Sequence, residues 1–192
     1  MKQNKLMQML LAIGLAGFAV SSVTAADKVK PSPAVEAKIT ETLKATFPDV
    51  GIAGMVQETE DGLTFFAVDM TSKGDKIDAD VMADGTLVAT EQAADIKTFP
   101  KAAKKALKKA TKGMKVVVTE IATTYAEADK KNPTANKAVK LDKPKVAYDA
   151  DVEQDGKKGE FAVDAEGTIL ESPKWLKAEG KEAKESGKEE KD

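Results

Sequence analysis

Glycine-containing turns divide most of this chain into segments of strand length, and this spacing limits the fold more than any other feature. An amphipathic segment has apolar residues at every fourth position from Val35 to Phe47. Four alternating segments follow it, at residues 52–58, 63–70, 76–82 and 86–91, separated by Asp61-Gly62, Lys73-Gly74 and Asp84-Gly85. Such dipeptides are typical of hairpin turns, because glycine adopts the positive φ that these turns require. The pattern predicts a helix followed by four antiparallel strands.

The same order of elements returns in the second half of the chain. After Pro100, alanines and Leu107 on one side of residues 101–112 predict a second helix. A displacement of 82 positions places Gly156 on Gly74 and Gly167 on Gly85, and the strands keep the same buried parity. We therefore predict an α+β fold of two tandem repeats, residues 32–97 and 98–176, each a helix packed on a four-stranded antiparallel sheet.

The two predicted helices align best at a displacement of 68 rather than 82, which leaves an insertion of 14 residues in the second half. The insertion falls between residues 123 and 143, a stretch that contains Asn132-Pro133 and several lysines. Because these residue types interrupt regular structure, we expect an extended loop or a short extra helix there.

Both ends of the chain differ from this pattern. Residues 1–26 contain Lys2 and Lys5, an apolar run and small residues at the end, as in a cleavable export signal. The apolar run of about 15 residues is shorter than the roughly 20 that a membrane-spanning helix needs, so we expect cleavage rather than an anchor. Residues 177–192 are charged and lack bulky apolar side chains, which predicts a disordered tail. The mature protein is expected in the periplasm or outside the cell.

Composition excludes several classes of function. The chain has no Cys and no His, so it lacks disulfides, thiol nucleophiles, imidazole bases and zinc sites of the usual kind. All 30 basic residues are lysines, and the formal net charge is −2, which disfavours binding to nucleic acid. We expect no enzyme activity, no cofactor and no stable membrane insertion after cleavage of the signal.

The turns and strands resemble those of the PepSY-like family. The resemblance covers residues 32–173 and is carried by Phe99-Pro100, by the segment Tyr148–Glu153 with its turn Asp155-Gly156, and by the turn ending in Gly167. Two such units in tandem also resemble the β-lactamase inhibitory protein architecture. The resemblance implies an exported, non-enzymatic protein-binding module, in some cases one that inhibits or regulates a peptidase or another hydrolase, with a sheet surface as its contact area.

Strand parity indicates which residues would contact a protein partner. On the side of the sheet facing away from the helices we expect Phe65 and Met82 beside Asp78 and Asp80, with Trp175 just past the last strand. The carboxylate pairs Asp78/Asp80 and Asp149/Asp151 are spaced by two and project from one side of their strands. Without a predicted cleft, we interpret these pairs as solvated strand positions.

An alternative function is that of a calcium-responsive or anion-binding protein of the cell envelope. Asp151, Glu153 and Asp155, with Gly156 next, match the opening of a calcium loop, and Glu160 is the nearest acid to the bidentate position. The twelfth position is Ala162, however, so the pattern favours a hairpin with alternating acids. Six lysines on the second helix could bind an anionic surface, but a solvated helix face explains them better.

Overall fold

The computed structural model describes residues 29–60, 62–132, 134–173 and 175–177. The predicted export signal and nearly all of the predicted disordered tail lie outside the described residues. The described elements are α1 (Pro33–Thr46), β1 (Gly51–Glu60), β2 (Leu63–Ser72), β3 (Asp75–Val81), β4 (Leu87–Ala93), the 3-10 turn η1 (Ile96–Thr98), α2 (Lys101–Ala110), β5 (Lys115–Ala128), β6 (Ala138–Gln154), β7 (Lys157–Val163), β8 (Ile169–Glu171) and β9 (Leu176–Lys177). No helix within the described part of the chain is long and apolar enough to cross a membrane.

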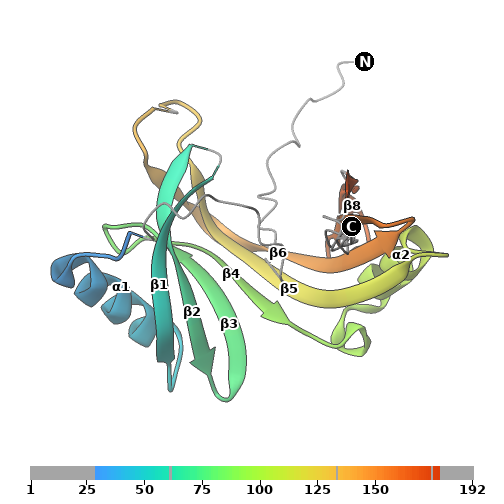
Figure 1. Ribbon diagram of the computed structural model, residues 1–192, viewed down its shortest axis with the longest axis horizontal. Helices are drawn as coiled ribbons and strands as arrows, with labels where there is room; N and C mark the ends of the chain where they lie inside the picture. The colour runs from blue at the N-terminus through green and yellow to red at the C-terminus, as the bar shows by residue number, and fades with distance from the viewer. Residues whose placement is uncertain (1–28, 61, 133, 174, 178–192) are drawn as a thin grey trace, which may run out of the picture.

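All strands of the described residues join one bent antiparallel sheet, in which β1 to β8 follow one another in chain order and β9 pairs with β7. Figure 1 shows the long strands β5 and β6 sweeping across the molecule, with α1 near one end of the sheet and α2 near the other. The prediction of two repeats, each a helix on its own four-stranded sheet, was therefore wrong.

The reason for this difference is the pairing of β4 with β5. Ala89 pairs with Thr124, and the ladder continues to Ala93 opposite Glu120. Two separate four-stranded sheets would have four edge strands with unpaired N–H and C=O groups, and pairing β4 with β5 removes two of these edges. The alternation of side chains predicts which face of a strand is buried, but it does not specify which edge pairs with which.

Both helices pack on the same face of this sheet. Ile39 and Leu43 of α1 are fully buried against β2, β3 and β4, in a cluster that includes Phe66 and Val68. Ala103 and Leu107 of α2 are fully buried against β6 and β7, in a cluster that includes Ala150, Val152, Phe161 and Val163. The strand registers place the two clusters on one side of the sheet. The predicted buried parity of both halves is confirmed.

The insertion in the second half forms a β-hairpin rather than the predicted loop or helix. β5 and β6 extend beyond the rest of the sheet to Ala128 and from Ala138, and we call this extension the arm (residues 126–140). Ala128 and Ala138 pack on Leu63, Phe65 and Met82, on the face opposite the helices. The Asn136 side chain accepts a hydrogen bond of 2.6 Å from the backbone N–H of Thr64, which fixes the arm to the β1–β2 turn.

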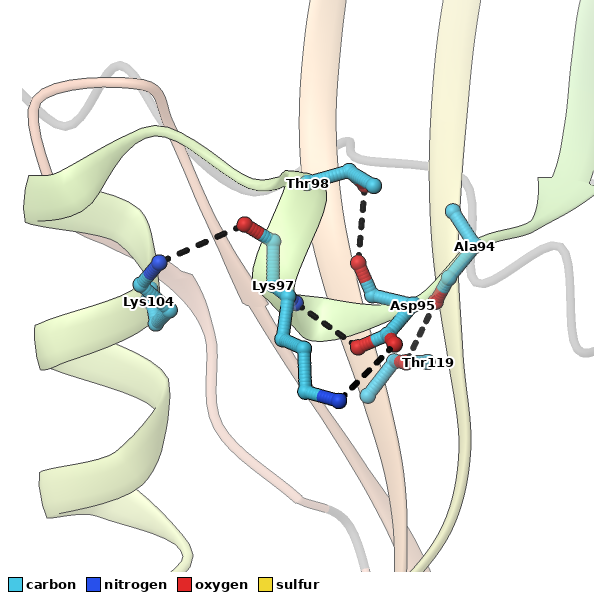
Figure 2. A network of polar contacts seen from close by, with 6 residues as sticks. All are labelled: Ala94, Asp95, Lys97, Thr98, Lys104 and Thr119. Carbon is cyan, nitrogen blue, oxygen red and sulfur yellow. Dashed lines mark hydrogen bonds and ion pairs between the residues drawn. The ribbon is translucent and has the colours of Figure 1, made fainter.

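A polar network orders the connection between β4 and α2 (Figure 2). The Asp95 carboxylate accepts from the Lys97 N–H at 2.8 Å, and the Thr98 hydroxyl donates to the Asp95 carbonyl at 2.7 Å. The Thr119 hydroxyl of β5 donates to the Ala94 carbonyl at 2.6 Å. The Lys104 ammonium of α2 donates to the Lys97 carbonyl at 3.3 Å. These bonds tie the start of the second half directly to β5.

Two glycines with positive φ provide a matched test of the packing of α2. Gly167 has φ +83, and a Cβ atom there would lie 2.8 Å from the Ala102 carbonyl oxygen of α2. Gly156 has φ +69, and a Cβ there would meet nothing within 4 Å. Gly156→Ala is expected to lower the free energy of unfolding by about 1 kcal/mol, since the strain is conformational alone.

Gly167→Ala must also displace α2, so we expect a larger loss of about 2–3 kcal/mol. Chemical unfolding of both variants measures the difference. Equal losses would mean that α2 does not approach the β7–β8 connection as closely as this.

Candidate binding surface on the open face of the sheet

The face of the sheet opposite α1 and α2, which we call the open face, is the inner side of the bend (Figure 1). Side chains alternate between the two faces along each strand. Since Phe66 and Val68 contact the α1 cluster, Phe65 and Asp69 belong to the open face, and the registers extend this assignment across the sheet. The acids on it are Glu58, Glu60, Asp69, Asp78, Asp80, Glu91, Glu120, Asp149, Asp151, Glu160 and Glu171.

Several of these acids lie directly opposite one another on adjacent strands. Asp78 pairs with Asp69 on one side and with Glu91 on the other. Glu120 pairs with Asp149, and Asp151 pairs with Glu160. Opposed like charges destabilise a sheet. The acids at the centre of the open face therefore form cross-strand pairs that are unfavourable whenever both members are ionised.

Burial makes these carboxyl groups hold their protons at unusually high pH. Desolvation, followed by the neighbouring acids, raises the pKa of Glu91 to about 10 and that of Asp149 to about 8. The same causes raise the pKa of Glu160 to about 8 and the pKa values of Asp80 and Glu120 to about 7. The group can therefore exchange protons near neutral pH, as an acid–base site or a cation-binding site does.

Three of the acids have carboxylate oxygens without a hydrogen-bond partner within the described part of the protein. They are Glu91 Oε2, Glu120 Oε1 and Asp149 Oδ1. Their residues are 5 %, 6 % and 6 % exposed. A buried polar atom without a partner is costly, and each such atom in a native fold calls for an explanation.

A small hollow lies among these side chains. Ala89, Ala122, Ala147 and Ala162 form its floor, Thr123 and Thr124 also line it, and the acids of the lining are Glu91, Asp149, Glu160 and Glu171. Its volume is ≈ 10 Å³, about the space of one water-sized group. The hollow exists because the alanine side chains are much shorter than the acidic side chains around them. Its volume suits one compact polar group and is too small for a sugar ring or a peptide unit.

Four of the predicted partner-binding residues lie on the open face, but their exposure differs from the prediction. Phe65 and Met82 are 2 % and 5 % exposed, because the arm covers them. Asp80 is buried as well, and only Asp78 is half-buried. The interpretation of Asp80 and Asp149 as solvated strand positions was wrong, since burial dominates the environment of both.

Trp175 lies on the other side of the sheet. A Cβ atom on Gly159 would come within 3.1 Å of the Trp175 ring, and Gly159 pairs with Val152, which belongs to the α2 cluster. Trp175 therefore lies on the face that carries the helices and is not part of the open face. Its role in partner binding stays a prediction, and any such role would be separate from that of the acids.

The residues of the calcium alternative do not converge. Asp151 and Glu160 are neighbours on the open face. The Lys115 ammonium donates to Glu153 at 2.8 Å and lowers the pKa of that carboxyl. Asp155 lies in the hairpin turn, where its φ is +51. Of the Asp and Glu side chains within the described ranges, no three are placed to hold one metal ion.

Sequence reasoning overlooked Glu91 and Glu120 as site residues. The sequence contained a sign of their burial, because Glu91 alternates with Ala89 and Ala93, and Glu120 alternates with Ala122, on one side of its strand. The strand registers are needed to show that Asp78 lies opposite Glu91 and that Glu120 lies opposite Asp149. The predicted hairpin pairing gave the neighbours within each half, but not the β4–β5 pairing that brings all these acids together.

The sheet and its two helices form a BLIP-like fold. A BLIP-like protein from Bacteroides fragilis superimposes with a TM-score of 0.54 at 18 % identity, over 82 % of this chain and 94 % of that one. A DUF2874 family protein from Bacteroides uniformis gives a TM-score of 0.51 at 13 % identity, over 70 % and 86 % of the two chains.

A third solved structure, of a candidate periplasmic protein from Bacteroides eggerthii, gives a TM-score of 0.52 at 14 % identity, over 77 % of this chain and 90 % of that one. No protein-family model matches the chain, and no curated protein matches it either. At these identities the likeness defines the architecture.

Proposed function

We propose that this chain is an exported, non-enzymatic module that binds another protein through the open face of its sheet. The observation that carries the proposal is the set of buried acids, several directly opposite one another, on a face that neither helix covers. Such an arrangement lowers the stability of the free protein, and a partner with complementary charge would relieve it. The small volume of the hollow supports binding rather than catalysis.

The comparisons support the coarse part of this proposal. One neighbour is BLIP-like, that is, similar to the β-lactamase inhibitory protein, and another is a candidate periplasmic protein. We extend the proposal to regulation of a secreted or periplasmic hydrolase as one role of such a module. The division of residues 32–97 and 98–176 into two PepSY-like sequence units that share the single sheet is part of the proposal, supported by the matching turns at Gly85 and Gly167.

Affinity capture with two charge-reversal variants tests the proposal. Asp78→Lys changes the open face, whereas Glu36→Lys makes the same change of charge on the exposed side of α1. We expect an envelope protein to be retained by the wild type and by Glu36→Lys, and to be lost with Asp78→Lys. Calorimetry with the purified partner should show at least a tenfold difference in Kd, about 1.4 kcal/mol.

Circular dichroism must first show that both variants are folded. Equal capture by the two variants would contradict the proposed surface, and the absence of any retained protein would contradict the proposed function. Heat released on adding Ca²⁺ to the wild type would instead favour the calcium-responsive alternative.

A further inference from the structure

We propose that the hollow between β4 and β7 receives one lysine or arginine side chain of the bound protein, held by Glu91 and Asp149. The inference rests on the proposed function and specifies the chemistry of the partner. It concerns the hollow with its alanine floor, rather than the whole open face. Two independent features carry it: the shape of the hollow, and the unpartnered carboxylate oxygens beside it.

The shape of the hollow fits the end of a long cationic side chain. Its ≈ 10 Å³ matches one ammonium group, or one end of a guanidinium group. The methyl groups of Ala89, Ala122, Ala147 and Ala162 offer apolar contact for the methylene stem of such a side chain. A cationic head among acids and an apolar stem along methyl groups is the arrangement that lysine and arginine favour.

The chemistry of the acids selects a charged donor. Glu91 and Asp149 line the hollow, are 5 % and 6 % exposed, and each has an oxygen that no group of the described residues satisfies. A water molecule would supply donors but no positive charge, and so would not stabilise the ionised form of these acids. An ammonium or guanidinium group supplies both.

A metal ion is a poorer fit to the same geometry. A calcium ion takes six to eight oxygen ligands at short range. In the described part of the chain, no three acids are placed to hold one ion. Two carboxylates that line the hollow together with alanines instead suit the separate N–H donors of a side chain.

The hollow is also expected to couple binding to proton release. Asp78 of β3 lies directly opposite Glu91. Asp80 of β3, Glu120 of β5, Asp149 of β6 and Glu160 of β7 raise the pKa of Glu91 through their charges. Asp149 faces Glu120 of β5, Asp151 of its own strand and Glu171 of β8. The charge of Lys158 on β7 lowers the pKa of Asp151, and the charge of Lys76 on β3 lowers that of Asp78, so both lysines oppose the effect of burial. A cation that enters displaces protons from the buried acids, so its affinity must increase with pH.

Nuclear magnetic resonance titration of the protein with amino-acid analogues tests the inference. The probes are N-acetyl-lysine methylamide, N-acetyl-arginine methylamide and the uncharged N-acetyl-norleucine methylamide. For ligands of this size we expect a Kd on the order of 1 mM for the better of the two cations. The backbone signals of Ala122 and Ala147 should shift with saturation for that cation and not for norleucine.

The pH dependence gives a second readout. Affinity for the cation should rise about tenfold per pH unit for each proton released, between about pH 6 and pH 7. The lysine analogue keeps its own charge over this range, since its ordinary pKa is about 10.4. The pH dependence therefore reports on the protein.

Three variants locate the site. Glu91→Gln and Asp149→Asn should each weaken cation binding about tenfold, as expected for the loss of one charge-assisted hydrogen bond. Asp142→Asn changes an exposed acid that does not line the hollow and should leave the affinity unchanged. Ala122→Met fills the hollow with an uncharged side chain and should abolish binding while the protein stays folded.

Each contrary outcome can be told apart from failure of the proposed function. Equal shifts with norleucine, no saturable shift with either cation, or unchanged affinity in Glu91→Gln would overturn the inference about the hollow. A partner that still binds Ala122→Met but fails to bind Asp78→Lys would leave the open face as the binding surface and remove the hollow from it. If the analogues bind in the hollow but no protein partner is retained, the cation site is supported and the proposed protein-binding function is contradicted.

Discussion

Raising the pH from about 5 to about 9 should destabilise the folded protein, whereas most proteins keep near-maximal stability up to about pH 8. The pKa values of Asp80, Glu91, Glu120, Asp149 and Glu160 are raised to between about 7 and about 10 in the fold. In the unfolded chain these groups lose their protons near their ordinary pKa values of 3.8 and 4.5. Above that range, the folded state binds more protons than the unfolded state, so stability falls with each further increase in pH.

The expected loss is large, because a tenfold change in the proton affinity of one carboxyl group corresponds to about 1.4 kcal/mol. The acids interact and lose their protons as a coupled set, and we expect a total fall of at least about 4 kcal/mol over this interval. Urea unfolding at a series of pH values measures it. The contribution of the acids is complete below about pH 4 and is lost progressively up to about pH 10.

A double variant separates this effect from general charge repulsion. Glu91→Gln combined with Asp149→Asn removes two of the strongest contributors, so its stability should change less with pH and exceed that of the wild type at about pH 8. Asp142→Asn, with the loss of one charge at an exposed position, should keep the wild-type profile. A wild-type stability that is constant across the interval would contradict the proposed burial of the acids.

Phe65→Ala should lower the free energy of unfolding by about 3–5 kcal/mol, as expected for the loss of a buried aromatic side chain. Phe65 is 2 % exposed and lies under the arm with Leu63 and Met82. An exposed contact residue would change stability by no more than about 0.5 kcal/mol. Chemical unfolding therefore distinguishes the role seen in the structure from the predicted role as an exposed anchor.

Val139→Ala is the control for the arm. Val139 is 48 % exposed, so its truncation should stay within about 0.5 kcal/mol of the wild type. Hydrogen exchange at Thr64, whose N–H donates to Asn136, should accelerate in Phe65→Ala and not in Val139→Ala. Loss of stability without faster exchange at Thr64 would show that Phe65 stabilises the sheet independently of the arm.

The sequence predicted the local structure of this protein well. The first helix was expected from the pattern between Val35 and Phe47, and α1 spans Pro33–Thr46. The turns at Lys73-Gly74 and Asp155-Gly156 have positive φ at both positions, as the hairpin pattern required. Turn chemistry and side-chain alternation act over a few residues, so the sequence shows them directly.

Longer-range arrangements were missed because each depends on contacts between distant parts of the chain. The β4–β5 pairing is a backbone contact that no side-chain pattern marks. The arm covers Phe65 with Ala128 and Ala138, which come from the other half of the chain. Trp175 crosses to the α2 side because Gly159 leaves room for it there. The acids of the candidate site were visible, but their burial follows from this same assembly.

The joining of β4 to β5 has a consequence for how a complex would form. The hydrogen-bonded ladder from Ala89 to Ala93, together with the bonds of Ala94 and Asp95, leaves no flexible hinge between the halves. The curvature of the inner surface is thus established during folding, before any partner arrives. This protein would therefore lose little conformational entropy on association. The partner has to match the shape of a preorganised, curved surface.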